Sequence, residues 1–163
     1  MTRILALDVG DRRIGVAVSD RTGLIATPLT VIRRASKVED FIRIIQLVRE
    51  QGVVGVVVGH PLNDDDSAGP QARRIERYAA ALREALREEG LDLRTSRPPF
   101  AVALVLWDES LSTQRAQEVM IASGRKARDR RARIDSTAAA VILQDYLDAN
   151  RHVPPHAVEE DVL

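Results

Sequence analysis

The fold expected for this chain follows from one stretch near its start: Ile4-Leu5-Ala6-Leu7-Asp8-Val9-Gly10, the turn Asp11-Arg12-Arg13, and Ile14-Gly15-Val16-Ala17-Val18-Ser19-Asp20. Two apolar runs around a short polar segment predict a strand, a tight turn and a second strand running back. Asp8 is a carboxylate inside the first apolar run, and burying it is costly without a basic partner, hydrogen bonds or a metal ion. Asp8 is therefore a candidate metal ligand, and a turn cap helped by Gly10 is the structural alternative.

The composition is typical of a soluble globular domain, with 163 residues, 45% hydrophobic and 29% charged. We expect one domain over residues 1–150 and a flexible acidic tail over residues 151–163. The chain has no cysteine, which excludes disulfides and thiolate metal sites. There is no signal-peptide pattern and no apolar run of membrane-spanning length, so the expected location is the cytoplasm, with no membrane partner.

The remaining helices and strands are predicted from hydrophobic periodicity and from residues that cap or break helices and strands. Residues 24–32 read as a third strand, in which Pro28 indicates an edge position or a bulge. A helix with a capping box at Ser36 to Glu39 follows, ending at Gly52. Its expected apolar stripe is Val38, Phe41, Ile42, Ile45 and Val48.

The second half of the chain alternates strands and helices. Residues 53–59 are apolar throughout, as in a central parallel strand, and Pro70 opens a helix that runs to about Glu89. A strand over 101–107, a helix from Ser112 or Thr113 to Gly124 and a last helix opened by Asp135 complete the order. Three meandering strands and two parallel strands predict an α/β fold with a five-stranded mixed sheet flanked by helices.

Acidic residues occur where catalytic groups usually lie in open α/β sheets. Asp8 lies on the first strand, Asp108 and Glu109 end a later strand, and Asp135 begins the last helix. Several hard oxygen ligands from separate segments suit a divalent cation that catalyses phosphoryl transfer. Each has a structural alternative, because Asp135 is a good helix N-cap and Asp108 and Glu109 can be solvated strand-end residues.

Basic residues gather immediately before Asp135. The segment 125–133 contains Arg125, Lys126, Arg128, Arg130, Arg131 and Arg133, which can hold a phosphate backbone or form a solvated face. Arg12 and Arg13 in the first turn are further candidates for nucleic-acid binding. Asn63, in the loop after the central strand, can hydrogen-bond a phosphate near the helix that Pro70 opens. None of the three histidines is assigned a ligand role.

With these residues assembled, the chain resembles the YqgF/RuvX family of pre-16S rRNA nucleases, also described as Holliday-junction-resolvase-like. The resemblance rests on four motifs in order, namely 7–10 with 13–20, 58–63 with 69–71, 107–113, and 134–144. It implies an RNase H-like fold and an endonuclease that depends on Mg²⁺ or Mn²⁺. It also implies an acidic triad of Asp8, Glu109 and Asp135, with Asp108 as a further possible ligand, and a role in rRNA maturation or in cutting branched DNA.

The sequence departs from that family pattern at Ser110, where the family usually has Arg, and at Asp64 to Asp66, where it usually has a glycine. Residues 91–99 also form a longer segment than usual. These differences bear on substrate geometry more than on the triad. A non-catalytic RNA-binding factor for ribosome assembly is the main competing reading, and an actin-like ATPase is a minor one. A homodimer is expected only by analogy with enzymes that cut two-fold junctions.

Overall fold

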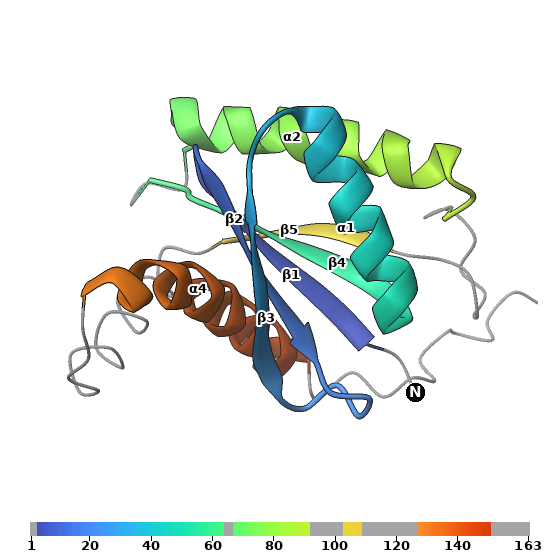
Figure 1. Cartoon of the computed structure of the whole chain (residues 1–163), viewed down its shortest axis with the longest axis vertical. Helices are drawn as coiled ribbons and strands as arrows, with labels where there is room; N and C mark the ends of the chain where they lie inside the picture. Colours follow the sequence, from blue (N-terminus) through green and yellow to red (C-terminus); the bar gives the residue numbers. More distant parts are fainter. Residues whose placement is uncertain (1–2, 64–66, 92–102, 109–126, 151–163) are drawn as a thin grey trace, which may run out of the picture.

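The sheet is built outward from the first strand. The computed structural model describes residues 3–63, 67–91, 103–108 and 127–150, in which five strands form one sheet in the order β3-β2-β1-β4-β5 (Figure 1). β1 (Arg3–Val9), β2 (Arg13–Ser19) and β3 (Ala26–Arg33) form an antiparallel meander. β4 (Val53–His60) runs parallel to β1, and β5 (Ala103–Asp108) runs parallel to β4. The predicted five-stranded mixed sheet is confirmed.

The position of β3 at the edge of the sheet explains how the strand accommodates a proline. The β2–β3 register shifts between Val16 and Ala17, whose partners are Thr30 and Pro28. A proline can occupy an edge strand beside such an irregularity because its missing N–H costs no ladder hydrogen bond. The strand starts at Ala26 rather than at residue 24.

Two helices begin and end where the sequence predicts. α1 (Lys37–Gln51) is capped by Ser36, whose Oγ accepts a 3.2 Å hydrogen bond from the backbone N–H of Glu39. It ends at Gly52, whose φ of 62° lies in the left-handed region that glycine adopts without strain. α2 (Pro70–Glu88) begins at Pro70, and it buries an apolar face formed by Ile75, Tyr78, Ala79, Leu82 and Leu86.

The helices form two layers on the sheet (Figure 1). α1 and α2 cover one face, and α4 (Ala127–Asn150) packs on the other, over β1, β2 and β3. Alternation along β1 divides the core, since Leu5 and Leu7 belong to the cluster under α1 and α2 while Ala6 packs against α4. The central strand β4 is buried on both faces, as its continuous apolar run predicts.

Small side chains let α4 approach the sheet. Ala6 and Ala17 face each other across β1 and β2 and are fully buried with Ala139, Ile142 and Leu143 of α4. Gln144 fixes the helix laterally: its Oε1 accepts from the Ala26 N–H at 2.9 Å and its Nε2 donates to the Leu24 carbonyl at 3.0 Å. Ala17 thereby gives β2 a small-residue surface against which α4 packs.

The predicted stripe of α1 is partly wrong. Val38 and Ile42 are 66% and 61% exposed, whereas the buried residues of the helix are Asp40, Ile44, Ile45, Leu47 and Val48. The helix is rotated from the predicted orientation because Asp40 finds charged and polar partners inside, as described below. Burying a paired carboxylate there leaves two apolar side chains in solvent.

The predicted start of the last helix is also wrong. α4 begins at Ala127, so Asp135 lies inside it and is not its N-cap. Residues 127–135 are mostly Arg and Ala, which are good helix formers, with no glycine or proline to stop the helix earlier. The predicted segments 91–99, 112–124 and 151–163 lie wholly or largely outside the described residues. Within the described part, no helix combines the length and the apolar character needed to cross a bilayer.

Candidate functional site

The carboxyl ends of β1, β4 and β5 lie along one edge of the sheet, because the three strands are parallel. Asp8 lies near the end of β1 and pairs with Gly15 of β2, and Asp108 at the end of β5 pairs with His60 of β4. The Asp8 side chain is half-buried and Asp108 is exposed. The fold therefore brings two of the four predicted carboxylates to one edge.

Asp8 lies on the face of the sheet that carries α4. Ala6, two residues earlier on the same strand, packs against that helix, and side chains alternate along a strand. The residue paired with Asp8 on β2 is Gly15, and on β4 the residue after Val58 is Gly59, so neither neighbour adds a side chain beside it. A group from another segment, or a ligand, can therefore approach the carboxylate on this face.

The other predicted acidic residues are placed only in part. Asp135 lies within α4, the helix on the face of Asp8, and Glu109 lies outside the described residues directly after the last residue of β5. No cluster of three His, Asp or Glu residues suited to a metal occurs among the residues that the structure describes, a set without Glu109. The triad remains a prediction.

The predicted basic residues that the structure describes lie on α4, on β2 and in the turn before β2. Arg128, Arg130, Arg131 and Arg133 belong to the first part of α4, while Arg125 and Lys126 lie outside the described residues. Arg12 is exposed in the β1–β2 turn, and Arg13 is half-buried at the first position of β2. Their contact with a nucleic acid stays a prediction.

The turn after Asp8 depends on a glycine. The Gly10 N–H donates a 2.9 Å hydrogen bond to the Arg13 carbonyl, and a Cβ added at Gly10 would lie 2.9 Å from that same oxygen. A larger residue therefore has to push the two strands apart at this point. The close approach fixes the direction in which β1 ends.

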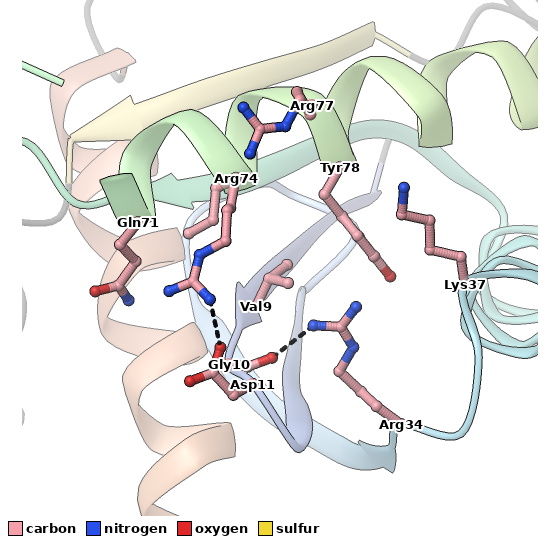
Figure 2. Close-up of a pocket in the computed structure, with 10 residues that line it drawn as sticks. Val9, Gly10, Asp11, Arg34, Lys37, Gln71, Arg74, Arg77 and Tyr78 are labelled. Carbon is pink, nitrogen blue, oxygen red and sulfur yellow. Dashed lines mark hydrogen bonds and ion pairs between the residues drawn. The ribbon is translucent and has the colours of Figure 1, made fainter. Parts of the chain in front are cut away.

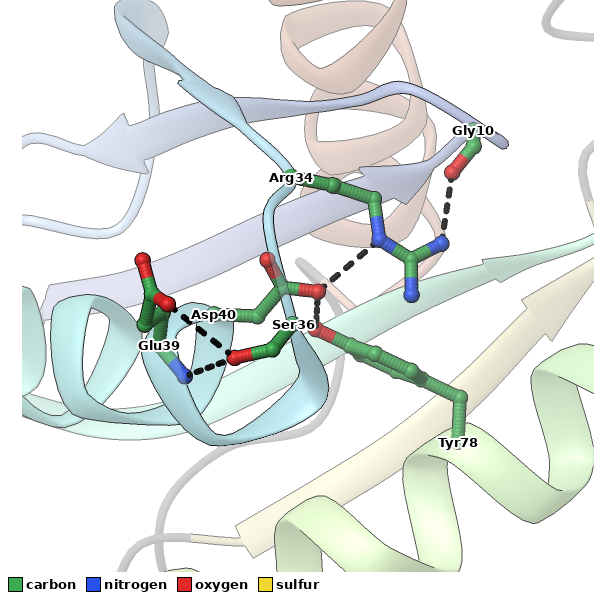
Figure 3. A network of polar contacts seen from close by, with 6 residues as sticks. All are labelled: Gly10, Arg34, Ser36, Glu39, Asp40 and Tyr78. Atoms are coloured by element: carbon green, nitrogen blue, oxygen red, sulfur yellow. Dashed lines mark hydrogen bonds and ion pairs between the residues drawn. The ribbon is translucent and has the colours of Figure 1, made fainter.

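A buried polar network ties this turn to α1 and α2 (Figure 3). Arg34 donates through Nη1 to the Gly10 carbonyl at 2.8 Å and through Nε to Asp40 Oδ2 at 2.8 Å. The Tyr78 hydroxyl donates to the same Asp40 oxygen at 3.3 Å, and the guanidinium carbon of Arg34 lies 5.0 Å from the centre of the Tyr78 ring. Side chains from α1, from α2 and from the segment before α1 thereby hold the peptide that follows Val9.

Burial makes this network sensitive to the loss of any member. Asp40 is 1% exposed, and its second oxygen, Oδ1, is buried with no hydrogen-bond partner among the residues that the structure describes. Burial, with the negative charge of Asp40, raises the pKa of Tyr78 well above its usual range, so the phenol remains a donor. The charge of Arg34 is what compensates the buried Asp40 carboxylate.

A cavity of about 250 Å³ opens between this network and α2 (Figure 2). Its floor is apolar, formed by Val9 and Ile75, and its wall contains the basic residues Arg34, Lys37, Arg74 and Arg77. Asp11 lies at the same site and forms an exposed 3.4 Å ion pair with Arg74. Since Val9 belongs to the core under α1 and α2, this cavity is on the opposite face of β1 from Asp8.

The loop between β4 and α2 is held by its own polar groups. Asn63 donates through Nδ2 to Ser67 Oγ at 2.8 Å, and its backbone N–H donates to the Ser67 carbonyl at 3.0 Å. Its side chain also lies against Gly69, where an added Cβ would be 3.4 Å from Asn63 Oδ1. Asn63, an exposed residue, therefore shapes the loop that leads into α2. The sequence predicted only a phosphate contact for it and not this structural role.

The sequence patterns did not predict the residues that form the buried polar network and the basic cavity on the α1/α2 face. Sequence reasoning assigned no functional role to Arg34, Asp40, Tyr78, Lys37 or Arg77. It also gave no ligand role to His60, which pairs with Glu76 at 2.9 Å. The available signal was Asp40 itself, an acidic residue in the first turn of an amphipathic helix shortly after an arginine. Such a pair is also common on solvated helix faces, so only the packing of α1 against α2 distinguishes the two cases.

Comparison with known proteins identifies the family. A family model described as RuvX, Holliday junction resolvase, matches residues 2–149. This chain belongs to the RuvX family. A relative from Thermoanaerobacter pseudethanolicus is 41% identical over 151 residues, covering 92% of this chain and 99% of the relative. One from Geobacillus kaustophilus is 42% identical, covering 91% and 99%; both bear the name "Putative pre-16S rRNA nuclease".

Solved structures confirm the RNase H-like fold of this RuvX chain at low sequence identity. Thermus thermophilus RuvC in complex with a Holliday junction substrate matches with a TM-score of 0.58 and 14% identity, covering 93% of this chain and 97% of that one. The fowlpox virus resolvase, solved with Holliday junction DNA, matches with a TM-score of 0.52 and 9% identity, covering 91% and 98%. The family and fold expected from the sequence motifs are thus confirmed.

Proposed function

We propose that this chain is a metal-dependent endonuclease that hydrolyses phosphodiester bonds in nucleic acid, with precursor 16S rRNA as its substrate. The observation that carries the proposal is Asp8, a half-buried carboxylate between two glycine positions at the carboxyl edge of the sheet in a RuvX-family chain. RNA is favoured over branched DNA because the relatives named for rRNA share about 41% identity, whereas the junction-bound structures share only the fold.

The position of α4 supports a site shared by Asp8 and Asp135. Gln144 of α4 is hydrogen-bonded to Ala26 of β3, which pairs with Ser19 of β2. Ser19 in turn accepts a hydrogen bond from the Ile4 N–H, so this part of α4 lies near the beginning of β1. Asp135 is about 14 Å further back along the helix at ~1.5 Å per residue. Asp8 is about 13 Å along β1 from Ile4 at ~3.3 Å per residue. The two distances agree with Asp135 lying near the level of Asp8.

The carboxylates present suit Mg²⁺ or Mn²⁺. Both ions prefer hard oxygen ligands, and Asp8 provides one on a rigid strand whose neighbours leave room on the α4 face. Asp135 and Glu109 would complete the set, with Asp108 at the same sheet edge as a further ligand. When bound, the cation supplies a more acidic water and stabilises negative charge on the phosphate.

The chain's own residues have separable roles in this proposal. Asp8 is set in place by pairing within the sheet, and the Gly10 turn behind it is held by Arg34. The basic side chains from Arg125 to Arg133 and those of Arg12 and Arg13 would bind the substrate backbone. Their contacts are with phosphates, so they position the strand without reading its sequence.

The deciding experiment is a cleavage assay of Asp8→Asn. Precursor 16S rRNA fragments, a four-way DNA junction and single-stranded DNA are each incubated with Mg²⁺ or Mn²⁺. We expect the wild type to cleave the precursor RNA and Asp8→Asn to cleave it at least ~100-fold more slowly, because a carboxylate that holds the catalytic metal contributes several kcal/mol to stabilising the transition state. The affinity for RNA should change less than ~3-fold.

Glu88→Gln, a distant exposed carboxylate on α2, is the matched control and should cleave like the wild type. Equal cleavage by wild type and Asp8→Asn would contradict the proposal. RNA binding with no cleavage on any of the three substrates would favour the non-catalytic assembly factor. Cleavage of the junction alone would move the substrate to branched DNA.

A further inference from the structure

The basic cavity on the α1/α2 face is outside the site assigned above. We propose that it binds a phosphate of the nucleic-acid backbone next to the one that is cleaved, which rests on the proposed function. The cavity is lined by Lys37 from α1, by Arg74 and Arg77 from α2, and by Arg34 from the segment before α1 (Figure 2).

The cavity has an excess of positive charge. Lys37 and Arg77 form no ion pair with any residue in the described ranges, and both are exposed. Arg74 has an exposed 3.4 Å pair with Asp11, a contact of the kind that contributes little and can be exchanged for a phosphate. The charge of Arg34 is balanced by Asp40 behind it. An anionic ligand therefore gains attraction from at least Lys37 and Arg77.

The size and donors of the cavity suit one phosphate group. Its volume of about 250 Å³ is below the roughly 300–1,000 Å³ of pockets that enclose whole small molecules. Arginine and lysine are the side chains that most often bind phosphate, and Gln71 at the start of α2 adds an amide to the lining. The site is thus suited to a charged group at its mouth and not to a buried cofactor.

The wall of the cavity is preorganised. Arg34 is fixed by hydrogen bonds to Gly10 and Asp40 and lies over the Tyr78 ring, so it loses little freedom when a ligand arrives. The same Arg34 contact joins the cavity to the Gly10 turn. A phosphate bound here would therefore be held at a fixed position relative to the end of β1.

The location explains why the ligand is a backbone and not a free anion. Val9 faces the cavity, and Asp8, its neighbour on β1, faces the α4 side. A strand that crosses the carboxyl edge of the sheet can reach both sides of β1. The basic first part of α4 and this cavity would then hold the substrate on either side of the cleavage position, which fixes where along the strand cleavage occurs.

The test compares two double variants of the full chain that each remove two positive charges, one from α1 and one from α2. Lys37→Gln/Arg77→Gln removes the two cavity cations that have no ion pair in the described ranges, while Arg43→Gln/Arg87→Gln changes exposed arginines outside the cavity. Binding of a labelled single-stranded RNA and a labelled four-way DNA junction is measured by fluorescence anisotropy with EDTA at several salt concentrations. Cleavage by the wild type is followed in parallel with Mg²⁺.

Loss of the single phosphate contact made by the cavity should reduce the magnitude of the slope of log K against log salt by about 0.7 for single-stranded RNA and about 0.9 for duplex arms. The Arg43/Arg87 control should keep the wild-type slope, because exposed charges beyond ~8 Å are screened at physiological salt. Lys37→Arg/Arg77→Lys, which restores the charges, should recover binding.

Unchanged slopes in Lys37→Gln/Arg77→Gln, or equal losses in both double variants, would overturn the inference. Calorimetry with inorganic phosphate separates the source of the anion: phosphate binding lost in the cavity variant while RNA and DNA binding persist would assign the site to a free anion. Wild-type cleavage with no cavity effect refutes this inference alone. A cavity effect with no cleavage by the wild type refutes the proposed catalysis alone.

Discussion

At the scale of single residues, Asp40 shows how one buried charge changes the environment of a turn. Its carboxylate is 1% exposed, and it accepts from Arg34 and Tyr78 while Arg34 holds the Gly10 carbonyl. Burial of a carboxylate is tolerated here because a guanidinium lies 2.8 Å away and the charge is in the first turn of α1, where the helix dipole favours it. The role of Asp40 is to anchor Arg34.

We predict that Asp40→Asn lowers the free energy of unfolding by about 2–3 kcal/mol, below the full cost of breaking a buried pair because Arg34 is 23% exposed. Tyr78→Phe should cost about 1 kcal/mol, since it removes one hydrogen bond. The measurement is urea denaturation, and Glu50→Gln on the exposed side of α1 should change stability by less than ~0.5 kcal/mol. An Asp40→Asn chain as stable as the wild type would contradict this account.

At the scale of elements, the β2–β3 connection is organised by Asp20. Its carboxylate accepts hydrogen bonds from the Thr22 side chain and from the backbone N–H groups of Thr22, Leu24 and Ile25. Gly23, with φ of 71°, completes the turn. The hydrogen bond from the Thr22 hydroxyl, followed by that from the Ile25 N–H, holds the pKa of Asp20 well below its usual range.

A lowered pKa in the folded chain means that the ionised carboxylate stabilises the fold above the unfolded value of about 4, and that this contribution is lost as pH falls below it. We predict that Asp20→Asn lowers the melting temperature at pH 7 and reduces the further fall between pH 5 and pH 2.5. Thermal melts across this range, compared with Asp11→Asn, measure the effect. An acid limb in Asp20→Asn as steep as that of the wild type would rule it out.

At the scale of the whole molecule, the sheet edge and α4 have to act together if a cation is shared between them. A ligand that binds only the folded state stabilises it by about 2.7 kcal/mol at a concentration 100 times its Kd. We predict that saturating Mg²⁺ or Mn²⁺ raises the wild-type melting temperature by about 5–10 °C, the shift expected for a domain of this size. Excess EDTA should reverse it, and Asp8→Asn should show a much smaller shift.

The comparison is made within each variant, with and without metal, because Asp8→Asn can alter the metal-free stability by itself. Glu88→Gln serves again as the exposed carboxylate control and should keep the full shift. Equal shifts in wild type and Asp8→Asn would place the cation elsewhere and remove the support for a metal site at Asp8.

Local sequence signals determined most of the framework. Alternating and continuous apolar runs specified the five strands, and Ser36, Gly52 and Pro70 marked the helix boundaries that the structure confirms, because caps and breakers act within a few residues. The motifs around Asp8, Asn63, Trp107 and Asp135 sufficed to identify the RuvX family. They also imply the acidic triad of Asp8, Glu109 and Asp135, which stays a prediction.

Only the tertiary structure decided how the helices face the sheet and what gathers at its edge. Apolar residues on two sides of α1 allowed more than one orientation, and pairing of Asp40 with Arg34 and Tyr78 selected the one that exposes Val38 and Ile42. The sequence pattern also did not predict that α4 starts at Ala127. Nor did it predict the basic cavity that Lys37 forms with Arg74 and Arg77. The physical reason is that burial and charge compensation depend on contacts between segments far apart in the chain, which local patterns do not encode.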